Sequence, residues 1–232
     1  MQSDHAATTL LFVGRAGVGK SSLINILCES LKENYQEVTQ AGRGVEPTTI
    51  EVGEYQAELR GMRVTLIDTP GVYSSSLDEG FEGLEVQKEI SAFVIVLSMA
   101  RPMDFLDNNS LKVFYGALCG GTPVQSIDDV FQHAIFVFTR SLSQAARGMT
   151  NQDVLADNMD QLRQVLIHLG VCEQTAQRIP FLAVDYLEMS TECHHDFWQA
   201  VERVTRGTEG RKLMFAPGLT EPQTATSGYL CV

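Results

Sequence analysis

Residues 14–21 of the chain read GRAGVGKS, which fits the pattern G-x-x-x-x-G-K-[ST]. The glycines of such a loop allow several backbone N–H groups to turn toward one anion, because no Cβ atom stands in the way. Lys20 can reach the β- and γ-phosphates of a nucleotide, and the hydroxyl of Ser21 can ligate Mg²⁺. The pattern therefore predicts a phosphate-binding loop.

The residues around this loop predict a strand before it and a helix after it. Thr9–Val13 is a nearly continuous apolar run, as expected of a strand that is covered on both faces. From Ser21 to Lys32, leucine and isoleucine recur at helical spacing, so the helix would point its N-terminal dipole at the same anion. The residues that we expect to contact the phosphates are Gly14, Arg15, Ala16, Gly17, Val18, Gly19, Lys20, Ser21 and Ser22.

The rest of the chain predicts an α/β fold. Apolar segments indicate buried strands at Ala92–Ser98, Ala134–Thr139 and Phe181–Val184, and Thr49–Leu59 is expected to pair with Arg63–Ile67. Helical patterns cover residues 78–90, 108–118, 158–169 and 196–206, and residues 119–130 are expected to form a loop. Because strands alternate with helices, we predict a P-loop NTPase fold. Its six-stranded sheet would be mostly parallel, with one antiparallel strand and helices on both faces.

Length and composition fit one large domain. The chain has 232 residues, of which 44% are hydrophobic. We expect a flexible N-terminus over residues 1–8, the domain over 9–206, and a flexible tail over 207–232, where Gly, Thr, Pro and Ser are frequent. The net charge of −12 makes nucleic acid an unfavourable partner, and no apolar run reaches the roughly 18 residues of a membrane span.

The cysteines indicate a reducing compartment. The chain has five, without a C-x-x-C pair, so we expect reduced thiols in a cytoplasmic protein. Residues 193–196 (Cys-His-His-Asp) are of metal-binding types, but neighbours on a helix diverge by about 100°. We therefore expect the start of a surface helix there rather than a zinc site.

A second motif, Asp68-Thr69-Pro70-Gly71, follows the strand that contains Arg63–Ile67. The Asp68 carboxylate could hold Mg²⁺ through water, and the N–H group of Gly71 could sense a γ-phosphate. Alone the motif would be an ordinary turn, but a phosphate-binding loop upstream favours the functional interpretation. Thr49 lies where its hydroxyl could close over Mg²⁺, although a threonine that merely favours β-structure is the alternative.

These motifs together resemble the translation-factor-related branch of P-loop GTPases. The series is G-R-x-G-x-G-K-S-S-L-I-N over residues 14–25, then Thr49, then D-T-P-G-V-Y nineteen residues further on. Within that branch the chain is similar to the GTPases of immunity-associated proteins (GIMAP-type), which are related to septins and to the chloroplast-import (Toc) GTPases. Softer traces are residues 88–90 (KEI) and 133–140 (HAIFVFTR).

The resemblance implies a G domain that binds GTP or GDP with Mg²⁺ and pairs with another copy across the nucleotide face. It assigns Mg²⁺ contacts to Ser21, Thr49 and Asp68, and catalytic roles to Lys20, Thr49 and Gly71. It places Thr139 and Arg140 beside the base. It also implies switch loops near residues 40–50 and 70–85, and a location in the cytoplasm or at the surface of an organelle.

The base-binding residues depart from the GTPase pattern. An Asp is expected soon after Thr139-Arg140, where it would accept two hydrogen bonds from guanine, but this chain continues Ser141-Leu142-Ser143. Without that acceptor, guanine loses its usual advantage over adenine. Asp185 could accept these bonds from the other side while Arg140 packs on the base; otherwise the base selectivity is weak.

The residues around the γ-phosphate also leave two functions open. Val72 follows Gly71, where a Ras-like enzyme has a glutamine that orients water. Arg15 could contact phosphates of its own or a paired subunit, or be a solvated loop side chain. We expect a guanine-nucleotide switch with slow hydrolysis that assembly stimulates. The alternative is a non-hydrolysing, nucleotide-bound scaffold with relaxed base selectivity.

Overall fold

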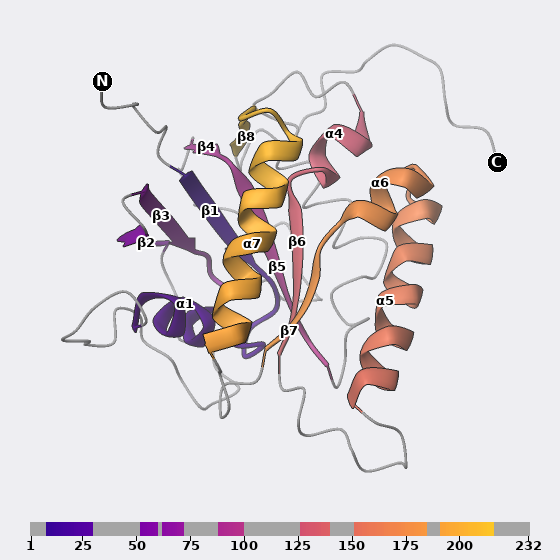
Figure 1. Ribbon diagram of the computed structural model, residues 1–232, viewed down its shortest axis with the longest axis horizontal. Coiled ribbons are helices and arrows are strands. Elements are labelled where there is room, and N and C mark those ends of the chain that lie inside the picture. Colours follow the sequence, from indigo (N-terminus) through magenta and orange to yellow (C-terminus); the bar gives the residue numbers. More distant parts are fainter. Residues whose placement is uncertain are drawn as a thin grey trace.

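The computed structural model describes residues 8–29, 52–59, 62–71, 88–99, 126–139, 151–184 and 191–215 (Figure 1). Six strands form one sheet in the order β2-β3-β1-β5-β6-β7. Their bounds are β1 Thr8–Val13, β2 Gly53–Leu59, β3 Met62–Asp68, β5 Ala92–Ser98, β6 Ala134–Thr139 and β7 Phe181–Val184. A second, two-stranded sheet pairs β4 (Lys88–Ile90) with β8 (Leu213–Phe215). The helices are α1 Lys20–Glu29, α4 Ile127–Phe131, α5 Asn151–His168, α6 Glu173–Arg178 and α7 Thr191–Gly207.

The large sheet has the predicted combination of parallel strands and one antiparallel strand. β1 lies between β3 and β5 and is parallel to both, and β5–β6 and β6–β7 are parallel as well. Only β2 runs antiparallel, in register with β3 so that Gly53 faces Asp68. The predicted fold class, a mostly parallel six-stranded sheet with one antiparallel strand, is confirmed.

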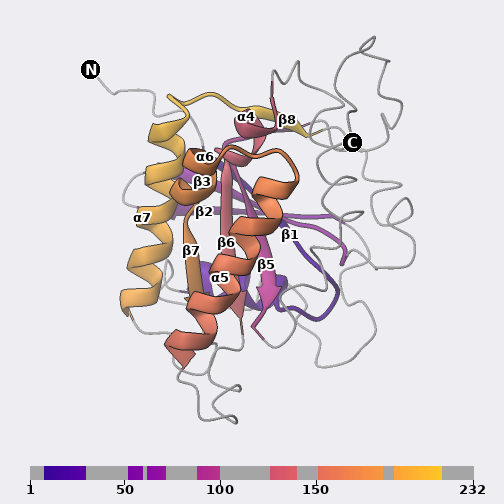
Figure 2. The same cartoon turned by 90° about the vertical axis from the view of Figure 1, so that its right-hand side faces the viewer.

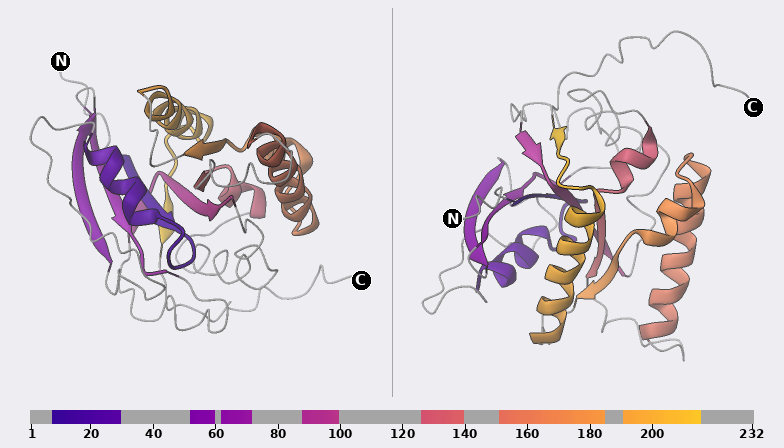
Figure 3. Two further views of the ribbon diagram at one scale, coloured as in Figure 1. Left: turned by 90° about the horizontal axis from the view of Figure 1, so that it is seen from below. Right: turned by 45° about the horizontal axis from the view of Figure 1, so that its top comes forward.

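Helices cover both faces of the sheet because the central strands are apolar on both. In β1, Leu10 and Phe12 face the helices α1 and α7, whereas Leu11 and Val13 face the side of α5. All four side chains are fully buried. In Figure 2, α7 stands to the left of β7 and α5 to its right. The left panel of Figure 3 looks at the end of the sheet where the loop joins β1 to α1.

Several short elements differ from the sequence-based expectation. The last part of the expected helix 78–90 is the strand β4, because Lys88–Ile90 pairs with β8 and Ile90 is fully buried. The expected loop 119–130 contains the start of α4, which Ser126 caps by accepting from the N–H of Asp129. The helix α6 was not anticipated, and α5 and α7 begin before the expected residues 158 and 196. The expected helix 108–118 lies outside the described residues.

Residues 208–215, which the sequence-based expectation puts in a flexible tail, belong to the folded domain. The helix α7 ends at Gly207, and the chain continues through the buried Thr208 into β8. Leu213 is only 5% exposed and belongs to the core on the α5 side. These contacts tie residues 208–215 to the domain, whereas residues 216–232 lie outside the described part. At the other end, Thr8 already belongs to β1.

Candidate functional site

The loop between β1 and α1 forms a tight turn at the carboxyl end of β1. Gly17 and Gly19 have φ angles of +75° and +99°, which L side chains rarely adopt. A Cβ atom on Gly14 would lie 2.4 Å from the carbonyl oxygen of Val96 in β5. Glycine is therefore required at these positions for the loop to close, and the backbone of α1 starts directly behind it at Lys20.

The Lys20 ammonium group is buried inside this turn. Its Nζ donates to the carbonyl oxygens of Gly14 at 3.0 Å and Arg15 at 3.2 Å, and the residue is 5% exposed. Burial lowers the pKa of Lys20 to about 8, and the negative charge of Asp68 partly opposes that shift. The result is a cation fixed beside the glycine backbone, where a phosphate can meet both.

Ser21 and Asp68 meet beside the lysine. The Ser21 hydroxyl, in the first turn of α1, donates to Oδ2 of Asp68 at 2.6 Å, and Asp68 at the end of β3 is fully buried. A hydroxyl and a carboxylate form a set of hard oxygen donors, which Mg²⁺ prefers. The pair therefore fits a Mg²⁺ site in which the Ser21 hydroxyl would ligate the ion and the Asp68 carboxylate would hold it through water.

The segment Thr69–Gly71 packs directly on the phosphate-binding loop. A Cβ atom on Gly71 would lie 2.4 Å from Cα and 2.5 Å from the backbone nitrogen of Ala16. The Thr69 hydroxyl donates to the carbonyl oxygen of Phe12 at 2.7 Å and is fully buried. The N–H group of Gly71 thus lies beside the loop, as sensing of a γ-phosphate requires, and Thr69 is an anchor that the sequence analysis did not assign.

Thr139 links the end of β6 to the same loop. Its hydroxyl donates to the carbonyl oxygen of Val18 at 2.7 Å, and the Leu97 carbonyl oxygen lies 3.1 Å away. The resemblance places Thr139 beside the base, whereas in the structure its side chain is fully buried against the protein. In the structure, the Thr139 hydroxyl holds the loop in place. The apolar sequence of β6 alone gives no indication of this contact, because its partner Val18 is distant in the chain.

The structure brings most predicted site residues to one place. The loop residues Gly14, Arg15, Ala16, Gly17, Val18, Gly19, Lys20, Ser21 and Ser22 are joined there by Asp68, Gly71 and Thr139. Thr49, Val72, Arg140 and Asp185 lie outside the described residues. At the other proposed cluster, α7 begins at Thr191, so residues 193–196 occupy the start of a helix as expected. Within the described ranges, no group of three His, Cys, Asp or Glu side chains could hold a metal ion.

Comparison with known proteins identifies this arrangement. A family model described as 50S ribosome-binding GTPase matches residues 9–115, which contain the loop, Asp68 and Gly71. The fold is that of a P-loop GTPase domain. Solved structures agree: Toc33 from Arabidopsis thaliana in complex with GDP and Mg²⁺ superposes with a TM-score of 0.65 at 16% identity. That match covers 93% of this chain and 90% of the other.

Curated relatives confirm the resemblance to GIMAP-type and Toc GTPases. The immune-associated nucleotide-binding protein 8 of Arabidopsis thaliana is 29% identical over 181 residues, or 72% of this chain and 46% of that protein. The translocase of chloroplast 108 of Physcomitrium patens is 40% identical over 73 residues, or 32% of this chain and 7% of that protein. This chain thus spans less than half the length of these relatives.

Proposed function

We propose that this chain is a guanine-nucleotide-binding switch domain. The observation that carries the proposal is the constellation at the end of β1 and β3. Lys20 lies within the glycine loop, Ser21 contacts Asp68 at 2.6 Å, and Gly71 packs against Ala16. These groups supply a cation, oxygen donors for Mg²⁺ and a backbone N–H group around one phosphate chain.

Each residue has a separate task in this proposal. The loop N–H groups and the start of α1 bind the β-phosphate, and Lys20 neutralises the β- and γ-phosphates. Ser21 and Asp68 hold Mg²⁺, together with Thr49. Gly71 responds to the γ-phosphate, and the chain after it is the segment that changes between the GTP and GDP states. Structures of Toc33 in complex with GDP and with GMPPNP, both with Mg²⁺, support this assignment of ligands.

Base recognition is where the sequence departs from the usual GTPase pattern, because the aspartate expected after Arg140 is absent. The Thr139 hydroxyl contacts the loop at Val18, so the chain that follows β6 begins beside the nucleotide. We propose that Arg140 packs on the base and that Asp185, directly after β7, accepts from guanine N1–H and N2–H₂. The C-terminal ends of β6 and β7 are neighbours, because Thr139 pairs with Val184 in register.

A titration of nucleotide-free protein with GDP, ADP and XDP in Mg²⁺ tests this proposal. We expect ADP to bind at least about a hundredfold more weakly than GDP, and Asp185→Ala to remove that difference. XDP carries a carbonyl oxygen in place of the guanine 2-amino group and should bind wild type weakly. Equal affinities for the three nucleotides would refute guanine recognition and leave only the phosphate site.

We further propose that hydrolysis is slow and that pairing across the nucleotide face stimulates it. Val72 cannot orient a water molecule by hydrogen bonding, so the isolated domain lacks that group of Ras-like enzymes. One solved structure is described by the statement that dimerisation is important for the GTPase activity of Toc33 and Toc159 components. It matches with a TM-score of 0.61 at 15% identity, over 90% of this chain.

A non-hydrolysing scaffold is the second candidate. The absence of a glutamine after Gly71 and of an aspartate after Arg140 favours it. Single-turnover assays separate the two: the switch predicts release of phosphate that accelerates with protein concentration. The scaffold predicts none over hours at any concentration.

For its location, we propose the cytoplasm, including the outer surface of an organelle. No helix in the described ranges is both long and apolar enough to cross a membrane. The similarity to translocase of chloroplast proteins supports a surface association. Fractionation of cells that express the tagged chain tests this, with salt-extractable membrane recovery as the expected result.

A further inference from the structure

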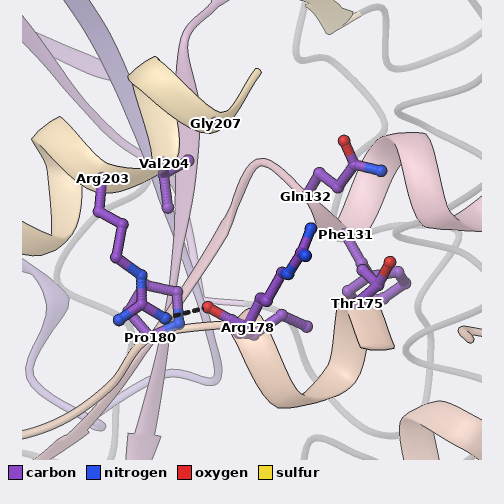
Figure 4. Close-up of a pocket in the computed structure, with 9 residues that line it drawn as sticks. Phe131, Gln132, Thr175, Arg178, Pro180, Arg203, Val204 and Gly207 are labelled. Carbon is purple, nitrogen blue, oxygen red and sulfur yellow. Dashed lines mark hydrogen bonds between the residues drawn. The ribbon is translucent and has the colours of Figure 1, made fainter. Parts of the chain in front are cut away.

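A cavity lies at the opposite end of the sheet from the phosphate-binding loop. It has a volume of about 360 Å³ and opens between α4, α6 and α7 (Figure 4). Of the residues that line it, Pro180 immediately precedes β7 and Gln132 lies two residues before β6, whereas the loop follows the carboxyl end of β1. Because these strands are parallel, the two sites lie at opposite ends of the strands. The volume lies within the range of small-molecule sites, roughly 300–1,000 Å³.

The charged side chains that line this cavity are both cationic. Arg178 comes from the end of α6 and Arg203 from α7, and no acidic residue lines the cavity. The Arg203 guanidinium donates to the backbone carbonyl of Arg178, which holds it against α6. In Figure 4 the Arg178 side chain extends from α6 toward Gln132. Two guanidinium groups thus border one cavity from two different elements.

Neither arginine has a carboxylate partner in the described part of the chain. Their neighbours do: Arg206 pairs with Glu202 at 3.2 Å, and Arg211 lies 3.8 Å from Asp129. Both side chains are exposed, so among the described residues they offer two cationic groups that no carboxylate neutralises. An external anion would supply the missing charge.

The carbonyl groups at the end of α7 do not compete for these cations. The Val204 carbonyl oxygen accepts from both the N–H and the hydroxyl of Thr208, at 3.0 and 3.1 Å. The Thr205 carbonyl accepts from the N–H of Gly210 at 3.1 Å. These capping bonds occupy the carbonyl groups of Val204 and Thr205 within the chain.

The other side of the cavity is apolar. Phe131, Ile179 and Val204 are 1%, 4% and 5% exposed, and Pro180 is buried beside them. Such a lining fits the body of an organic molecule rather than a hydrated inorganic ion. We therefore infer that this cavity binds a small organic anion. The ligand would be an organic phosphate or carboxylate whose charged head group contacts Arg178 and Arg203. Planar guanidinium groups suit both head groups.

Calorimetric titration of the full chain with phenyl phosphate and with benzoate tests this inference. We expect one molecule to bind per chain, and phenol, which lacks the charge, to bind at least about tenfold more weakly. Arg178→Gln and Arg203→Gln should each weaken binding about tenfold or more, because each removes a charge-assisted hydrogen bond. Arg206→Gln is the matched control on α7 and should leave the affinity unchanged.

Lys20→Ala separates this site from the phosphate-binding loop, whatever the fate of the proposed nucleotide function. The probes should bind Lys20→Ala as they bind wild type, and binding by only one probe would identify the preferred head group. Gly207→Leu provides a variant with both arginines intact, because a Cβ atom at Gly207 meets nothing within 4 Å and the added side chain can fill the cavity. We expect it to block the probes. Three results would overturn the inference: absence of binding to wild type, equal binding of phenol, or unchanged binding to a variant that carries both Arg178→Gln and Arg203→Gln.

Discussion

At the scale of the residue, the behaviour of the site depends on the buried charge of Lys20. The ammonium group is held by two carbonyl oxygens of the loop, but it lacks the solvent that normally stabilises it. A bound phosphate would replace that solvent and restore the pKa toward its ordinary value. In our proposal, Lys20 therefore couples nucleotide binding to protonation.

This coupling predicts opposite pH effects on stability and on affinity. The pKa of Lys20 is 10.5 ordinarily and about 8 in the fold, so between these values the unfolded chain binds more protons. The free energy of unfolding of ligand-free protein should therefore rise with pH through this window. GDP affinity should fall, by up to about tenfold per pH unit, because the phosphate prefers charged Lys20. Denaturant unfolding and calorimetry at about pH 7.5 and about pH 9.5 measure both.

Lys20→Met is the control for this pH prediction, because it keeps the aliphatic chain and removes the titrating group. Other groups that titrate in the window, such as Tyr55, whose pKa burial raises, remain in both proteins and cancel in the difference. Identical pH profiles for wild type and Lys20→Met would contradict the role given to Lys20.

The Ser21–Asp68 pair predicts a specific loss of Mg²⁺ dependence. Asp68→Asn keeps the shape of the side chain and removes its charge, so Mg²⁺ should no longer strengthen the binding of a non-hydrolysable GTP analogue. In wild type we expect Mg²⁺ to improve that affinity by about tenfold or more. Titrations with and without EDTA give the ratio directly; a ratio near that of wild type would place the ion elsewhere.

At the scale of the element, two buried threonine hydroxyl groups connect the ends of three strands and the loop before α1. Thr69 joins the end of β3 to β1, and Thr139 joins the end of β6 to the loop before α1. These bonds connect the loop and the strand before it to the ends of β3 and β6. Thr139→Val should lower the free energy of unfolding by about 1–3 kcal/mol, since it leaves the Val18 carbonyl without this donor.

Measurement of Thr139→Val needs two readouts. Urea unfolding gives the stability, and GDP titration should show several-fold weaker binding from a loosened loop. Thr65→Val, a partly exposed threonine in β3, is the control. Unchanged GDP affinity together with lost stability would show that the tie supports the fold without shaping the loop.

The strand β8 predicts a measurable contribution from residues beyond α7. Leu213 is 5% exposed within the core on the α5 side, so Leu213→Ala should cost about 2–4 kcal/mol of stability. Lys212→Ala, next to it, loses only an ion pair with Glu89 at 3.5 Å between partly exposed groups and should cost less than about 1 kcal/mol. Equal, small effects in thermal and urea unfolding would mean that β8 does not belong to the cooperative unit.

The elements that the sequence predicted are those with strong local patterns. The strands β5, β6 and β7 were assigned at their observed bounds because they are continuous apolar runs that tolerate no other placement. The loop at residues 14–21, with Asp68 and Gly71, was found because its chemistry fixes residue type and spacing. By contrast, β4 exists through pairing with a strand more than a hundred residues away, and α6 is six residues long with a cysteine cap. Such elements depend on tertiary contacts that no local pattern contains.

At the scale of the whole molecule, our proposals place two binding sites at opposite ends of the strands. The phosphate-binding loop lies at the carboxyl ends of β1 and β3, and the arginine-lined cavity lies at the other end. Assembly belongs to the first end in our proposal. Sedimentation should therefore show a monomer with GDP and a dimer or larger species with a non-hydrolysable GTP analogue. A monomer at every concentration with both nucleotides would exclude pairing across the nucleotide face.

The most direct test of the central claim is calorimetric titration of Mg²⁺–GDP into nucleotide-free wild type and Lys20→Ala. Our account predicts one GDP per chain in wild type and at least about a hundredfold loss of affinity in the variant, because a buried charge-assisted contact disappears. The variant should remain folded by circular dichroism, since removal of a poorly solvated charge does not disrupt the core. No binding to wild type, or equal binding to both proteins, would contradict the account.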